Sequence, residues 1–324
     1  MKNDVENEKR IEEISNQLIK LARDKDCNDW PFRNQILYTE CNLGLWVQIC
    51  ERALIGSEDD IAKIRLLLEV VNGLRRQKSA MESASIKLES AGELIALLPD
   101  DYPQKVRLLE LCAYHGAIIF HALGRFDDAA KCHALESRLA TDNRGRWLAI
   151  FNQQLAIFYA SLSEGKTPID LLDVAVTKAL EVLSDDSVEN NRWRANILCH
   201  YVFCSWLAGK DREVNTDWAI RYLQYQLPKD LAPAFSHALP VIEAIKAYWD
   251  SDYSKALKLA NSEKVKGDLG WYGNALLVQL AVRRKQHRAT RQILAEIGTL
   301  SVNGCGGHVA KAAAEYVGLT LILD

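Results

Sequence analysis

The pair Cys305 and His308 comes closest to a reactive constellation in this chain of 324 residues. Both stand in the glycine-rich run Asn303-Gly304-Cys305-Gly306-Gly307-His308, directly before an expected final helix that begins near Val309. An imidazole and a helix N-terminus both favour the thiolate form of cysteine, so a nucleophilic Cys305 is one hypothesis. Catalytic Cys–His pairs are usually distant in sequence and need an orienting third group, which the sequence does not identify. We therefore favour a connector to a terminal capping helix and expect that the chain is not an enzyme.

The spacing of histidines and cysteines does not indicate a metal site. No two of the seven histidines are three or four residues apart, and the eight cysteines include no CxxC pair, although metal sites commonly use such spacings. The sequence also contains no phosphate-loop, dinucleotide-binding or metalloprotease motif. We expect neither a metal nor a cofactor.

The distribution of cysteines and apolar residues predicts a cytoplasmic protein. Scattered cysteines in a chain of this length are typical of reduced thiols rather than of a secreted disulfide scaffold. Residues 1–6 are polar, unlike the start of a signal peptide. No apolar run approaches the roughly 18 residues of a spanning helix, so we expect no membrane contact.

Two similar segments contain the candidate binding residues. Asn143-Arg144-Gly145-Arg146-Trp147 and Asn191-Arg192-Trp193-Arg194 stand where the first helix of two successive helical units is expected to begin. Guanidinium groups bind carboxylates bidentately, so a ladder of arginines would suit an acidic protein or peptide. The candidate groove residues are Arg146, Asn152, Arg194, Asn196 and His200. The favoured alternative is that these arginines and asparagines lie in breaks and cap helices.

A second candidate surface is a basic patch. It consists of Arg283, Arg284, Lys285, Arg288 and Arg291. Such a cluster could bind an acidic partner or a phosphate backbone, while a solvated turn between helices is the favoured alternative. No aromatic residue is interleaved, the net charge is −3 and the pI is about 6.2, so nucleic-acid binding is not expected;.

The composition and the hydrophobic periodicity predict an all-α protein. The chain contains 7 prolines and 17 glycines, fewer than the average usage of about 5% and about 7% would give. Apolar residues recur at spacings of three and four, as at Ile11, Ile14, Leu18 and Leu21, and strand-like alternation is missing. Pro240 either begins a helix or kinks a longer one, and we favour the kink.

The breaks between expected helices repeat at a nearly constant interval. Gly124, Gly165, Gly209 and Ser251 each follow a long apolar-patterned segment, and they are 41, 44 and 42 residues apart. Repetition near this period is typical of stacked antiparallel helical hairpins, because one hairpin alone cannot bury its apolar face. We therefore expect an α-solenoid.

Two of these turns resemble the tetratricopeptide repeat. Gly124-x-Phe126-x-x-Ala129 and the weaker Asp252-Tyr253-x-x-Ala256 have the glycine or polar break, the aromatic and the small residue of that repeat's turn. The resemblance is good over 104–140, fair over 231–263 and only architectural elsewhere, and the interval exceeds the family's 34 residues. It implies a superhelix whose concave groove, lined by the first helix of each hairpin, binds peptides or proteins and carries no catalysis.

Together these observations predict one solenoid over residues 1–324. We expect divergent N-terminal hairpins in 1–98, tetratricopeptide-like hairpins in 104–298 and a capping helix in 307–323. The favoured function is a non-enzymatic scaffold or adaptor that binds a protein or peptide in the concave groove. The alternative is a regulatory module that senses a ligand or peptide within a larger signalling system.

Overall fold

The computed structural model describes residues 2–24, 35–39, 41–210, 214–262, 272–283, 286–300 and 305–320. All regular elements in these residues are helices and none is a strand, which confirms the all-α prediction. No helix in the described part is long and apolar enough to cross a lipid bilayer. The chain divides into two compact units, residues 1–120 and 121–324.

The first unit is built from consecutive helices that pack on their sequence neighbours. Its elements are α1 (Lys2–Arg23), α3 (Gln35–Thr39), α4 (Leu43–Ile55), α5 (Asp60–Arg75), η1 (Lys78–Ala80), α6 (Met81–Leu97) and most of α7 (Lys105–Ala122). Helix α5 packs between α4 and α6, and α1 packs on both α4 and α5. Asn42 and Asp59 cap α4 and α5, because their side chains accept hydrogen bonds from the amides of Leu45 and Ala62;.

A buried arginine ties three segments of the first unit together. Arg65 on α5 is fully buried and donates to the backbone oxygens of Ala22 and Asp24 at the end of α1. Its second terminal nitrogen donates to the side chain of Gln104, which precedes α7. Buried guanidinium groups are tolerated only when they are hydrogen-bonded, so these three contacts fix where α1, α5 and α7 meet.

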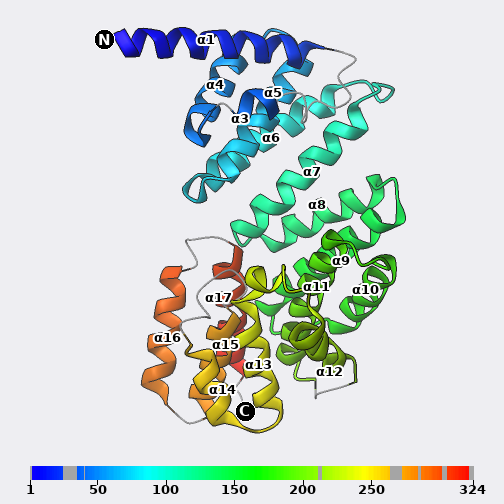
Figure 1. The fold of residues 1–324 in the computed structure, drawn as a ribbon, viewed down its shortest axis with the longest axis vertical. Helices are drawn as coiled ribbons and strands as arrows, with labels where there is room; N and C mark the ends of the chain where they lie inside the picture. The colour runs from blue at the N-terminus through cyan, green and yellow to red at the C-terminus, as the bar shows by residue number, and fades with distance from the viewer. Residues whose placement is uncertain are drawn as a thin grey trace. The chain divides into compact units, whose positions relative to one another are not determined.

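The second unit continues the same arrangement around one hydrophobic core (Figure 1). Its elements are α8 (Phe126–Leu139), α9 (Asn143–Leu162), α10 (Ile169–Val182), α11 (Val188–Leu207), α12 (Val214–Arg221), the π-helix η2 (Tyr222–Gln226), the 3₁₀-helix η3 (Ala232–Phe235), α13 (Ala238–Trp249), α14 (Tyr253–Ala260), α15 (Tyr272–Arg283), α16 (His287–Leu300) and α17 (Cys305–Thr320). Helix α9 packs on both α8 and α10, α13 packs on α14, and α15 packs on α16.

Pro240 corrects one expectation about these elements. It lies in the first turn of α13, which begins at Ala238 after the short helix η3. The predicted kink in a longer helix is therefore wrong. A proline is tolerated there because the amides of the first helical turn have no partner within the helix.

Four turns share one backbone conformation. Gly124, Gly165 and Gly209 have φ of 71°, 71° and 68°, and Ser251 has φ of 60°. Each follows a helix that precedes a short connection to the next one, namely α7, α9, α11 and α13. Among the described residues Ser251 is the one non-glycine with positive φ. Positive φ thus occurs at each of the four evenly spaced breaks.

The turn residues allow a direct test of this backbone requirement. A Cβ at Gly165 or Gly209 would meet no atom within 4 Å, so Gly165→Ala and Gly209→Ala change only the backbone preference. Each should lower the free energy of unfolding by about 1–2 kcal/mol, the cost of a left-handed non-glycine residue. Ser251→Gly should raise it by up to about 1 kcal/mol. Urea denaturation of the three variants measures the change in the free energy of unfolding, which should be a loss for the two alanine variants and a gain for Ser251→Gly. A destabilised Ser251→Gly protein would contradict the argument.

Candidate functional site

The predicted groove residue Arg194 closes the end of a neighbouring helix. It lies on α11, and its guanidinium donates to the carbonyls of Leu183 at 2.5 Å and Asp185 at 3.2 Å, just past the end of α10. It also donates to Asn191 Oδ1 at 2.6 Å and lies over the Tyr222 ring at 5.7 Å. These contacts correspond to the capping alternative, because they use the arginine's donors inside the fold.

The environments of the other predicted groove residues differ from one another. Arg146 is exposed in the first turn of α9, and Asn152 and Asn196 are partly buried on α9 and α11. The neighbouring Arg144, not Arg146, joins the two helices, since it donates to Asn190 Oδ1 at 3.0 Å and Glu189 Oε1 at 2.7 Å. The two similar segments, 143–147 and 191–194, therefore do not place Arg146 and Arg194 in equivalent positions.

The two arginines should differ sharply in their effect on stability. Arg194→Ala leaves the carbonyls at the end of α10 without their charged donor and should cost about 2–3 kcal/mol. Arg146→Ala removes an exposed side chain and should change stability by less than about 0.5 kcal/mol. Thermal or chemical denaturation gives both values. Equal effects would mean that Arg194 does not cap α10.

His200, the fifth predicted groove residue, lies at the junction of three helices. Its Nδ1 is 2.8 Å from the hydroxyl of Tyr159 on α9 and 3.3 Å from the hydroxyl of Tyr272 on α15. The two tyrosines are buried and their hydroxyls are 3.4 Å apart. Burial lowers the pKa of His200 to about 4, so the imidazole is neutral at physiological pH;. This junction closes the space between α9, α11 and α15.

A row of packed aromatic and histidine rings extends from this junction toward the turn between α7 and α8. Phe126 packs against Tyr159 with ring centroids 5.6 Å apart and against His121 at 5.9 Å. His121 in turn packs against His133 at 5.5 Å. Burial, and then the neighbouring His133, lower the pKa of His121 to about 3. His121 and His133 thus pack beside the turn between α7 and α8.

Helix α17 packs on a part of the unit that is distant in sequence. It contacts α15 and α16, its neighbours along the chain, and also α9. Its buried side chains are Val309, Ala310, Ala313, Ala314 and Val317. Because an end cap needs contacts only with the last hairpin, the contact with α9 goes beyond what the predicted capping helix requires.

Gly124 and His308 approach most closely at this contact. A Cβ at Gly124 would lie 2.7 Å from Nδ1 and 3.1 Å from Cβ of His308. Any other residue at 124 would therefore push against α17. Gly165 and Gly209 have the same φ but open space around them.

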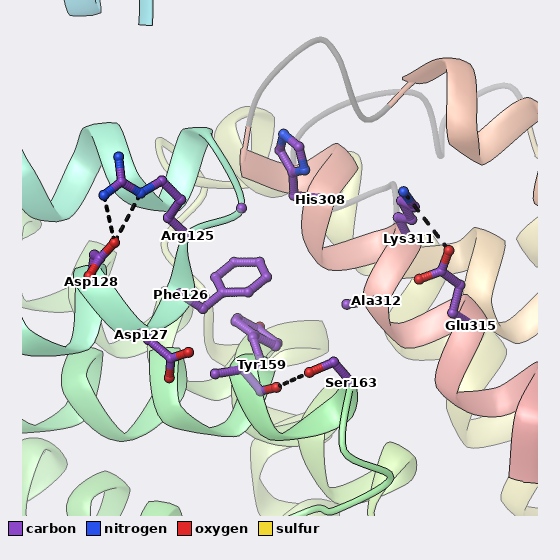
Figure 2. Close-up of a pocket in the computed structure, with 12 residues that line it drawn as sticks. Arg125, Phe126, Asp127, Asp128, Tyr159, Ser163, His308, Lys311, Ala312 and Glu315 are labelled. Atoms are coloured by element: carbon purple, nitrogen blue, oxygen red, sulfur yellow. Dashed lines mark hydrogen bonds and ion pairs between the residues drawn. The ribbon is translucent and has the colours of Figure 1, made fainter. Parts of the chain in front are cut away.

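A recess of about 390 Å³ opens beside this approach. Figure 2 shows the rings of Phe126 and Tyr159 in it, between the α7–α8 turn and α17. The described lining is Gly124, Arg125, Phe126, Asp127, Asp128, Tyr159, Ala160, Ser163, His308, Lys311, Ala312 and Glu315. It combines an aromatic surface with a rim of both charges.

The rim charges are arranged in local pairs. Arg125 is 2.7 Å from Asp128, and hydrogen bonds from Lys131 and Arg125 lower the pKa of that carboxyl. Lys311 is 4.0 Å from Glu315, one turn along α17. Burial and the nearby Lys311 lower the pKa of His308, so its ring is neutral at physiological pH;. The recess therefore has polar groups of both signs above an apolar surface.

Three of the five residues of the basic patch, Arg283, Arg288 and Arg291, lie in the described part of the chain. Arg283 stacks on Tyr248 and Tyr253 at 5.1 and 5.2 Å and donates to the Tyr253 hydroxyl at 2.7 Å. Arg288 and Arg291 are exposed on α16. Arg284 and Lys285 lie outside the described residues, as does the side chain of Cys305.

The described residues show no group of three or more His, Cys, Asp or Glu side chains that could hold a metal ion.

The chain matches no known family model, curated protein or solved structure. The resemblance to the tetratricopeptide repeat thus stays a prediction that depends on the turn residues and their spacing.

The close approach of Gly124 and His308 predicts a measurable coupling. Gly124→Ala should cost the left-handed strain of Gly165→Ala plus about 1–3 kcal/mol of overpacking against His308. A second substitution, His308→Ala, should remove most of that excess, since the ring accounts for the shortest distances. A double-mutant cycle by urea denaturation measures the coupling. Equal losses for Gly124→Ala and Gly165→Ala would show that α17 does not press on the turn.

Proposed function

We propose that this chain is a non-enzymatic, tetratricopeptide-like helical-repeat protein that binds a segment of another protein. Helices that pack on their sequence neighbours support this proposal, as do the four equivalent turns at intervals of 41, 44 and 42 residues. Such arrays stack hairpins into extended surfaces that serve for recognition. A tetratricopeptide-like turn at Gly124-x-Phe126-x-x-Ala129 adds to this support.

The recess beside α17 is the observation that favours a binding role most. Protein-binding surfaces combine a buried apolar centre, which receives an anchor side chain, with a polar rim that excludes water. Phe126, Tyr159 and Ala312 supply the apolar part, and Arg125, Asp127 and Lys311 belong to the rim. A volume of about 390 Å³ is at the lower end of ligand pockets, which suits an anchor side chain of a peptide;.

The recess changes which partner chemistry is expected. A ladder of Arg146 and Arg194 would favour an acidic peptide, but Arg194 donates to carbonyls of its own chain. The recess has cations and carboxylates together, so it favours an apolar anchor flanked by charges of either sign. An acidic partner remains the better match for the exposed Arg288 and Arg291 on α16;.

One observation favours a sensing module as the second candidate. His308, Lys311, Ala312 and Glu315 of α17 form one wall of the recess, so a ligand there would contact a helix that also packs on α9. Binding of a ligand could then change the packing of α17 on α9. A thermal shift with small molecules of the host extract, absent with peptides, would favour this second candidate.

Charge reversal at the recess tests the proposed binding site. Arg125→Glu with Lys311→Glu inverts two rim charges, so we expect at least a tenfold weaker affinity for the partner segment, with a melting temperature close to the parent's. Arg146→Glu is the matched control, because Arg146 is exposed and does not line the recess. Quantitative mass spectrometry of proteins retained from host extract identifies the segment, and calorimetry then measures its affinity. Loss of binding in Arg146→Glu alone would move the site to the start of α9.

A further inference from the structure

Helix α17 has the pattern of a docked amphipathic helix. Its buried residues Val309, Ala310, Ala313, Ala314 and Val317 follow one face, while Lys311 and Glu315 are exposed on the other. Alanines along the contact let two helices approach closely, so the surface beneath is shaped for small side chains. The covered surface belongs to α9, α15 and α16.

The stability of the docked helix depends on its surroundings. Its fully buried residues are three alanines and two valines, and Ala312 and Tyr316 pack partly against the same core. Each of these alanines and valines buries less apolar area than a leucine or isoleucine would. Gly306 and Gly307 lie in its first turn, and glycine is a poor helix former. Helices in proteins gain most of their stability from tertiary packing, so the structure of α17 depends on the surface that it covers;.

The recess and the covered surface are continuous. Ala312 and His308 line the recess, whereas their neighbours Val309 and Ala313 are buried against the unit. A partner that enters beside Phe126 and Tyr159 therefore meets the edge of α17 first. Displacement of α17 would extend the recess along α9.

We infer that α17 reversibly occupies a helix-binding surface of the second unit. The partner of that surface is an amphipathic helix of another protein with small residues at α17's spacing, that is at positions i, i+1, i+4, i+5 and i+8. The pattern comes from the occupant seen in the structure, and the inference rests on the proposed function. While docked, α17 supplies Lys311 and Ala312 to the recess for the partner's first contact, and the partner's helix then competes with α17 for the covered surface.

A synthetic helix can probe the surface without a known partner. The probe is a fluorescein-labelled peptide of residues 305–320 in which His308 is replaced by Ala. Because this probe lacks the imidazole that meets residue 124, Gly124→Ala in the full chain weakens the chain's own α17 but not the probe. Anisotropy titrations compare the parent with Gly124→Ala, Gly165→Ala and Gly124→Ala/His308→Ala.

We expect the probe to bind Gly124→Ala at least tenfold more tightly than the parent. Gly165→Ala has the same backbone strain without the contact and should bind like the parent, and the double variant should return close to the parent's affinity. A probe with Ala313→Leu and Ala314→Leu should fail to bind, because the surface accepts only small residues. Hydrogen exchange should show faster exchange of the α17 amides in Gly124→Ala alone.

Two results would overturn the inference. Equal affinity of the probe for Gly124→Ala and Gly165→Ala would make α17 a permanent part of the unit. A concentration-dependent dimer of Gly124→Ala without the probe would make the occupant α17 of a second copy. Neither result touches the charge-reversal experiment at Arg125 and Lys311, so failure of the proposed function is detected separately.

Discussion

The hydrogen-bonded junction of Tyr159, His200 and Tyr272 determines how the second unit closes. A buried hydroxyl or imidazole without a partner is costly, and this neutral histidine brings both hydroxyls to one nitrogen;. The hydrogen bonds link α15 to α9, although the two tyrosines are 113 residues apart. Phe203 stacks on Tyr272 with centroids 4.2 Å apart, so apolar packing reinforces the polar contact;.

This junction gives His200 a structural role in the second unit. The sequence assigned His200 to an open groove, yet the same residue joins the helices that would have lined it. Tyr159 also packs against Phe126, which begins α8 beside the α7–α8 turn. Both rings line the recess. Tyr159 thus belongs both to the junction with His200 and to the lining of the recess.

The features that the sequence predicted are those with a local cause. Helix periodicity and the rarity of breakers predict the all-α fold, and Gly124, Gly165 and Gly209 mark turns because positive φ favours glycine;. Helix capping by Arg194 is the interpretation that the sequence favours over a ladder of arginines, but the sequence does not identify the capped helix, because the acceptors at Leu183 and Asp185 follow α10. The contact of α17 with α9 has no local signal at all, because it depends on how the intervening helices turn back.

Gly124 meets two separate structural requirements, a left-handed backbone and close packing against His308. In the resemblance to a tetratricopeptide turn it is a residue that ends a helix, and its φ of 71° satisfies that role as Gly165 does. At Gly124 the missing side chain also makes room for His308, whereas a Cβ at Gly165 would meet no atom within 4 Å. Turn chemistry alone would tolerate Ser, as at position 251, but close approach would not. The glycine that defines the turn is therefore also what permits the C-terminal helix to dock.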